Sequence, residues 1–281
     1  MASNAATEQV RQKGRRAAGH SWFHHLARIG LAGRGVIYVL IGVLAVQVAF
    51  GSGGGEADQK GALATVMGTP GGKVLVWVIV VGFAGLALWQ YAEALYGQPV
   101  PNGHKPRKRL ASLGRAVFYT ATLVGTLGFA LGNKGKSSDQ QSQSFTAKAM
   151  GQPGGRWLVL AFGIAVAAFS VVMLFKAVMR KFLKELKTEQ MNRRMRQIAT
   201  IVGVTGHVAR GLVFGGISAF LIYAAVTFDP GKAKGLDGTL RQFAGTPAGP
   251  WLLVAVAAGL TVFGVYSFIE ARWRKVEAVN T

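Results

Sequence analysis

Residues 33–48 read GRGVIYVLIGVLAVQV, an arginine motif followed by an almost unbroken apolar run. The run lacks the alternation of polar and apolar residues that a strand of a membrane β-barrel requires. With its neighbours it covers residues 29–50, and about 20 apolar residues in a helix cross a hydrocarbon layer roughly 30 Å thick. This stretch therefore predicts a transmembrane helix.

Five further apolar stretches of similar length follow along the chain. They cover residues 74–96, 110–132, 157–179, 198–228 and 251–271. Charged residues make up only 15% of the chain and gather between these stretches, whereas a soluble protein carries charge on the faces of its helices. The sequence therefore predicts an all-α membrane protein with six transmembrane helices.

The arginine motif of the first apolar stretch occurs three times. Its copies are GRGVIY around Arg34, GRAVFY around Arg115 and ARGLVF around Arg210, and each opens an odd-numbered helix. A glycine-flanked proline precedes each even-numbered helix: Pro70, Pro153 and Pro247. Proline pre-sets its own φ and glycine tolerates positive φ, so this element suits a tight turn into a helix. The chain is therefore three copies of one helix pair.

Two helices in each copy mean that all three copies cross the membrane in the same direction. We expect pseudo-three-fold symmetry about the membrane normal, unlike the inverted repeats of many transporters. The repeats are predicted at residues 28–97, 98–187 and 188–275. A basic N-terminal segment, 1–27, and a C-terminal tail, 276–281, flank them.

A short amphipathic piece precedes each glycine-flanked proline, at residues 62–67, 145–150 and 240–244. Each piece is long enough for about one or two helical turns. We expect these pieces to lie at the outer membrane interface, either as short helices or as ordered loops.

Positive charge is distributed unevenly over the loops. Most of the 32 lysine and arginine residues fall at the two ends of the chain and in the loops near 97–110 and 180–198. By the positive-inside rule, these loops and both termini are expected in the cytoplasm. The net charge of +21 then reflects membrane topology, so nucleic acid is not an expected partner.

The repeated elements form a pattern that other membrane proteins share. An arginine, a small residue, an apolar pair and an aromatic residue open one helix, and Gly-x-Pro-x-Gly, Trp-Leu and Glu-Ala-Arg-x-Arg mark the other. The third copy matches best, with GTPAGPWL at 245–252 and EARWR at 270–274, and the second departs most, with Lys176 in place of an acid. The chain resembles the bacterial membrane family called domain of unknown function 1206. This resemblance implies a six-span membrane protein, of a kind common in actinobacteria, and no established activity.

Ionisable residues close the even-numbered helices at a fixed position. Counted from the last glycine of each turn, the same offset reaches Glu93, Lys176 and Glu270. The motif arginines open the odd-numbered helices at a similar depth, and charges there are costly unless they pair or reach water. Six side chains are therefore expected to ring the cytoplasmic end of the bundle: Arg34, Arg115, Arg210, Lys176, Glu93 and Glu270.

This ring has three interpretations. Salt bridges between helices would hold the units in register, with Tyr38 and Tyr119 on the same faces as their arginines. Four cations against two anions could instead bind an anion or a lipid headgroup, since arginine offers forked donors to phosphate. The same bridges could also gate a solute path.

Two pairs of glycines have the small-xxx-small spacing that lets membrane helices approach closely. They are Gly128 with Gly132 and Gly211 with Gly215. We expect them at helix–helix contacts; the alternatives are a helix that bends or slides, or a face between copies of the chain.

No catalytic constellation occurs in the sequence. Cysteine is absent, and nucleotide-binding, serine-hydrolase and zinc-protease motifs are missing, so we predict no enzymatic activity, no cofactor and no metal site. We favour a protein that packs against a membrane partner or a second copy, or that binds anionic lipid headgroups at its cytoplasmic face. The alternative is a small transporter or channel for an anion or metabolite, with Gln47 and Thr122 as weak candidates for deep polar residues on its path.

Overall fold

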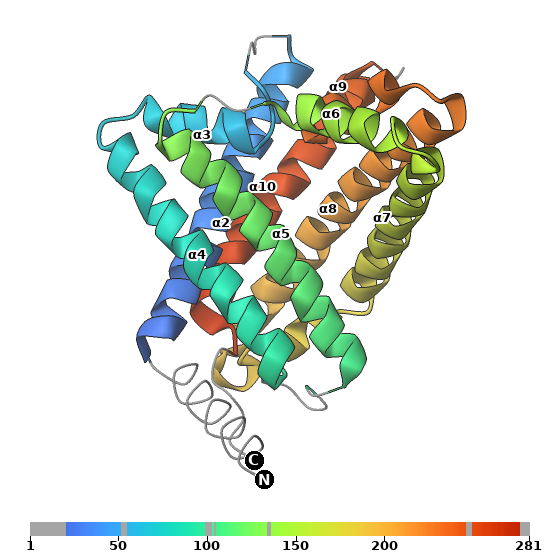
Figure 1. Ribbon diagram of the computed structural model, residues 1–281. Helices are drawn as coiled ribbons and strands as arrows, with labels where there is room; N and C mark the ends of the chain where they lie inside the picture. Colours follow the sequence, from blue (N-terminus) through green and yellow to red (C-terminus); the bar gives the residue numbers. More distant parts are fainter. Residues whose placement is uncertain are drawn as a thin grey trace.

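The computed structural model describes residues 21–51, 55–98, 103, 105–133, 136–245 and 249–275. Six helices are long and apolar enough to cross a membrane, which confirms the predicted all-α membrane fold. They are α2 (Ser21–Ala49), α4 (Gly72–Tyr96), α5 (Pro106–Ala130), α7 (Gly155–Val178), α8 (Arg193–Thr227) and α10 (Gly249–Trp273), all seen in Figure 1.

Two of the predicted turns take the expected backbone form. Gly71 and Gly154 adopt φ of 76° and 75°, a left-handed conformation that favours glycine, immediately before α4 and α7. The third turn, around Pro247, lies outside the described residues, as do 1–20 of the N-terminal segment and the tail 276–281.

The six long helices pack in a cyclic order. The second helix of each repeat lies against the first helix of the next: α4 against α5, α7 against α8, and α10 against α2. Within the first and third repeats the two helices also pack together, α2 on α4 and α8 on α10. In the second repeat α5 and α7 do not pack along their lengths. The ring of helices is therefore open at the α5–α7 step.

Close backbone approach explains several glycines in the long helices. A Cβ on Gly30 of α2 would overlap the carbonyl oxygen of Gly82 on α4, so only glycine fits there. Gly211 of α8 faces Leu174 of α7 at similarly short range, and Gly215 lies beside Ser170 of the same helix. The packing prediction therefore holds for this pair.

The other predicted glycine pair does not pack within the chain. Gly128 of α5 has nothing within 4 Å of the position its Cβ would occupy. Gly132 lies beyond the end of α5 with φ of 88°, where a left-handed residue ends the helix. The interpretation of these two glycines as a packing motif within the chain was wrong, because no helix among the described residues packs on α5 at Gly128.

Three short helices lie across the end of the bundle opposite the ends of α4 and α10 (Figure 1). They are α3 (Gln59–Met67), α6 (Ser138–Met150) and α9 (Leu236–Ala244). They contain the amphipathic pieces expected at 62–67, 145–150 and 240–244, and each begins earlier than predicted.

Aspartates link these short helices in a cycle. Each carboxylate of one repeat accepts a backbone N–H of the next: Asp58 from Ser138 at 2.9 Å, Asp139 from Gly235 at 2.7 Å, and Asp237 from Ala57 at 2.8 Å. Carboxylates near helix N-termini satisfy N–H groups that have no partner inside the helix. This end of the molecule is therefore held together by bonds between repeats, which the sequence patterns did not reveal.

Candidate functional site

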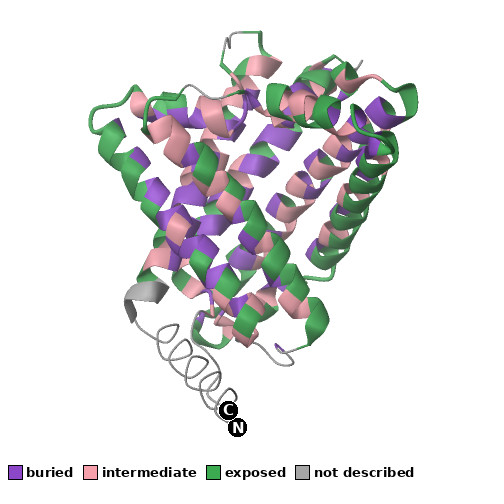
Figure 2. Cartoon of the chain, viewed as in Figure 1, coloured by how far each residue is buried: buried purple, intermediate pink, exposed green. Residues whose placement is uncertain are grey.

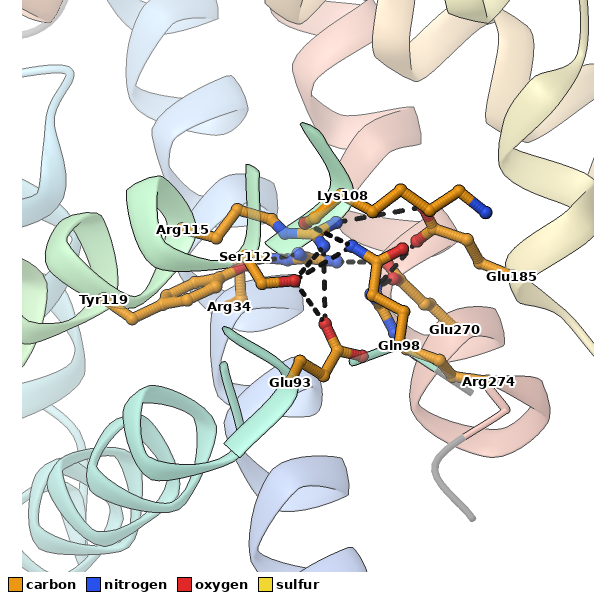
Figure 3. Close-up of polar contacts among 10 residues, drawn as sticks. All are labelled: Arg34, Glu93, Gln98, Lys108, Ser112, Arg115, Tyr119, Glu185, Glu270 and Arg274. Carbon is orange, nitrogen blue, oxygen red and sulfur yellow. Dashed lines mark hydrogen bonds and ion pairs between the residues drawn. The ribbon is translucent and has the colours of Figure 1, made fainter. Parts of the chain in front are cut away.

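The opposite end of the bundle carries an ion-pair network, which we call the charged cluster. It lies where α4 and α10 end, beside the loop that joins α7 to α8. Figure 3 shows its members: Arg34, Glu93, Arg115, Glu185, Glu270 and Arg274.

Arg34 of α2 is buried, and each of its three guanidinium nitrogens donates a hydrogen bond. It donates from Nη2 to Glu270 Oε2 at 2.5 Å, from Nε to Ser267 Oγ at 3.1 Å, and from Nη1 to the Tyr119 hydroxyl at 2.8 Å. The side chains of Arg34 and Glu270 are each only 7% exposed. A buried arginine needs such complete pairing, since an uncompensated charge there is strongly destabilising. Arg34 therefore ties α2 to α10 and to α5.

A second pair joins α4 to α5. Arg115 approaches Glu93 at 3.4 Å, and the Ser112 hydroxyl donates to the same carboxylate oxygen at 3.0 Å. Glu93 is nearly buried, whereas the Arg115 side chain is 30% exposed and also lies 3.8 Å from Glu185. Water can reach this pair more easily than it can reach the pair of Arg34 and Glu270.

Two members of the cluster were missed by sequence reasoning. Arg274 forms ion pairs with Glu270 and, at 3.0 Å, with Glu185, and its guanidinium lies 4.5 Å from the centre of the Trp89 ring. The Glu-Ala-Arg-x-Arg element at 270–274 contained a signal for Arg274. Glu185 had none, because it belongs to a loop.

The loop reaches the cluster through a short 3₁₀ helix, η1 (Lys181–Glu185), followed by η2 (Thr188–Gln190). Backbone bonds join it to the end of α10: the Lys187 N–H donates to Trp273 O and the Lys275 N–H to Glu185 O. Burial acts to raise the pKa of the Glu185 carboxyl, but the charges of Arg274 and Arg115 outweigh it and lower that pKa. Glu185 is therefore an anion in the network.

Arg210 differs from the other arginines. Within the described part of the chain it has no ion pair with a carboxylate, and its Nε is buried without a hydrogen-bond partner. Its guanidinium instead lies over three aromatic rings, at 4.9 Å from Phe263, 5.3 Å from Phe214 and 5.6 Å from Tyr38. Cation–π contacts stabilise a charge less than a carboxylate does.

The six predicted residues are thus brought together only in part. Two inter-repeat pairs form, Arg34 with Glu270 and Arg115 with Glu93. Arg210 has no acid, and Lys176 is exposed and takes part in none of the ion pairs among described residues.

The pairs follow the cyclic order of the helices. The arginine of the first repeat binds the glutamate of the third, and the arginine of the second binds that of the first. The same rule would pair Arg210 of the third repeat with the residue at position 176 of the second. That residue is lysine, so the third pair is missing although α7 and α8 pack against each other.

The tyrosines of the motif also act between repeats. Tyr119 accepts from Arg34 of the first repeat, and Tyr38 lies beneath Arg210 of the third. Spacing along one helix placed each tyrosine near its own arginine, but the helix packing brings it to the arginine of another repeat.

Comparison with known proteins agrees with this three-part organisation. The family model described as Domain of Unknown Function (DUF1206) matches three segments, residues 29–97, 110–180 and 205–274. The chain belongs to the DUF1206 family. A DUF1206 repeat thus corresponds to one helix pair of the bundle.

A relative of similar length occurs in Bacillus subtilis (strain 168). Its curated description is "Uncharacterized protein YxxB", and it is 32% identical over 252 residues, which cover 89% of this chain and 90% of the relative. No solved structure matches the chain. Family membership therefore supports the three-repeat organisation and does not indicate an activity.

Proposed function

We propose that this DUF1206 protein is a non-enzymatic protein of the bacterial inner membrane that binds anionic lipid headgroups at its charged end. The observation that supports it is Arg210, a half-buried cation without a carboxylate partner among the described residues. Phosphate accepts forked hydrogen bonds from arginine, so an anionic headgroup would supply the missing negative charge.

The proposal places the charged end and both termini in the cytoplasm. The basic loops before α5 and between α7 and α8 lie at this end, and the positive-inside rule assigns such loops to the cytoplasmic side. Lysine and arginine beside a membrane attract the anionic lipids of that leaflet.

Structural salt bridges account for four residues of the predicted ring, Arg34, Glu270, Arg115 and Glu93. Arg34 and Arg115 are already paired with glutamates across repeat boundaries, so their first role is to hold the repeats together. The headgroup-binding role then rests on Arg210 rather than on all three motif arginines.

The transport alternative gains no support from its candidate residues. Gln47 is exposed on the surface of the bundle, and the Thr122 hydroxyl donates to Phe118 O within its own helix. A polar path would need such groups to face a common interior. We therefore retain the binding proposal.

Native mass spectrometry of the gently purified protein tests the proposal. Wild-type protein should retain phosphatidylglycerol at collision energies that remove phosphatidylcholine. An Arg210→Ala variant should lose this preference, and so should an Arg34→Ala, Arg115→Ala, Arg210→Ala triple variant that circular dichroism shows to be folded. Equal retention of both lipids by the wild-type protein would refute headgroup binding, and an unchanged preference in folded Arg210→Ala would refute the assignment to Arg210.

A further inference from the structure

One face of α7 is uncovered where the equivalent faces of the other even-numbered helices are buried. The three helices can be aligned on their first glycines, and three positions spaced seven residues apart then lie on one face. In the first and third repeats these positions are at most 5% exposed: Ile79, Leu86 and Glu93 in α4, and Val256, Phe263 and Glu270 in α10. The second repeat has Phe162, Phe169 and Lys176 there. The two phenylalanines are 47% and 49% exposed, and Lys176 is exposed as well.

The cause is the open α5–α7 step. In the first and third repeats the partner helix of the same repeat packs on this face, as α2 does on Ile79 and α8 does on Phe263. In the second repeat α5 does not pack along α7. Figure 2 shows α7 as largely exposed, in contrast to the buried stripes of α2 and α10. The second repeat therefore has a strip along α7, defined by Phe162, Phe169 and Lys176, on which no other long helix of the same repeat packs among the described residues.

The strip connects both ends of the bundle. Phe162 packs near Phe145 of α6, with ring centres 6.0 Å apart. Phe169 contacts Phe214 of α8 edge to face, with ring centres 5.5 Å apart, and the guanidinium of Arg210 lies over the Phe214 ring. An apolar chain lying along the strip would therefore have a cation at its end.

Arg210 and Lys176 lie on facing segments of α8 and α7. Gly211, next to Arg210, packs against Leu174, two residues before Lys176, and the Ser170 hydroxyl donates to Gly211 O at 2.7 Å. Two cations thus stand where the cyclic order puts an arginine–glutamate pair.

Glu185, the acid on which the charge of Lys176 acts, does not neutralise this position. The charge of Lys176 acts on Glu185, but Glu185 is already paired with Arg274 at 3.0 Å and lies 3.8 Å from Arg115. Positive charge therefore remains at the charged end of the strip.

We propose that the strip and its two cations form a lateral binding site for one anionic glycerophospholipid. Arg210 and Lys176 bind the phosphate, which takes the place of the absent glutamate carboxylate, and an acyl chain lies over Phe162 and Phe169. The inference rests on the proposed function and adds to it a position, a stoichiometry of one and a route of entry from the bilayer. A free phosphate shares the headgroup chemistry but would gain nothing from the apolar strip.

Lys176→Glu tests the site, because it restores the acid that the cycle lacks and supplies Arg210 with an internal partner. Binding of dioleoyl phosphatidylglycerol in nanodiscs, followed by native mass spectrometry, should weaken about tenfold or more, as expected for loss of a charge-assisted hydrogen bond. Lys184→Glu is the matched control, since it makes the same charge change in η1, at a residue that does not belong to the strip, and should bind as wild type.

Two further arms separate the sources of the anion. Phe169→Ala should weaken binding of the long-chain lipid and leave binding of glycerol phosphate, which has no acyl chain, unchanged. Tighter binding of glycerol phosphate than of the lipid would show a phosphate site and overturn the lipid assignment. Binding of an acidic protein segment at the same cations, in competition with the lipid, would overturn it too.

The outcomes distinguish the two proposals. If wild type prefers phosphatidylglycerol and Lys176→Glu keeps that preference undiminished, the lateral site is refuted while headgroup binding elsewhere on the charged end stands. If Lys184→Glu weakens binding as much as Lys176→Glu, a general charge effect replaces the site. If wild type shows no preference for the anionic lipid, both proposals fail.

Discussion

Replacement of Glu270 by glutamine measures how much the charged cluster contributes to stability. The change leaves Arg34 buried and without its carboxylate, and Arg274 keeps only Glu185. Breaking a buried ion pair by removing one partner costs about 3–5 kcal/mol. We therefore expect Glu270→Gln to lower the free energy of unfolding by about 3–5 kcal/mol.

Glu93→Gln is the internal comparison. Its partner Arg115 is 30% exposed and has a second acid, Glu185, within 3.8 Å, so water and Glu185 compensate much of the lost charge. Pairs with such exposure are worth about 1 kcal/mol or less. The hydrogen bond that the Ser112 hydroxyl donates to Glu93 is also weakened, so we expect the free energy of unfolding to fall by about 1–2 kcal/mol in all.

The assay is equilibrium unfolding in mixed detergent micelles, with helical content and tryptophan fluorescence recorded along an SDS gradient. A double-mutant cycle with Arg34→Gln isolates the pair from other effects of each change. Equal losses for Glu270→Gln and Glu93→Gln, or a coupling energy near zero between residues 34 and 270, would refute the argument that burial decides the strength of the pair.

Three further predictions follow from other parts of the structure. Asp237→Ala removes the acceptor of a buried backbone N–H from the first repeat, so stability should fall by about 1–3 kcal/mol, with Asp237→Asn falling less in the same unfolding assay. The lowered pKa of Glu185 means that its contribution is present above its ordinary pKa of 4.5 and lost as pH falls below that value. The stability difference between wild type and Glu185→Gln should therefore be constant from pH 7 to about pH 5.5 and shrink below pH 4.5; a difference that persists at lower pH would contradict this. Gly30→Ala should lower the thermal midpoint because its Cβ would overlap the carbonyl oxygen of Gly82, whereas Gly128→Ala, which faces open space, should leave it unchanged or raise it.

Local and repeated features of this protein were accessible from the sequence. The six helices follow from apolar length alone, because a segment that crosses lipid must satisfy its backbone within itself. The repeats follow from the recurrence of the arginine motif around Arg34, Arg115 and Arg210, and the family match covers the same three segments. Glu93, Lys176 and Glu270 could be found in the same way, because each lies the same number of residues after the glycine that opens its helix.

The pairing between repeats was decided only by the tertiary structure. Which arginine meets which glutamate depends on the cyclic packing of α4 on α5, α7 on α8 and α10 on α2, and no spacing within one helix contains that order. Glu185 enters the cluster because a loop folds back beneath α10, and loops carry no periodic signal.

The sequence by itself determined that Lys176 stands where an acid stands in the other repeats. The tertiary structure decided what that means: α5 and α7 do not pack, Arg210 has no carboxylate among the described residues, and Phe162 and Phe169 are left uncovered. The physical reason is that a charge, or an apolar face, acquires its role from the groups packed against it, and those groups come from distant parts of the chain.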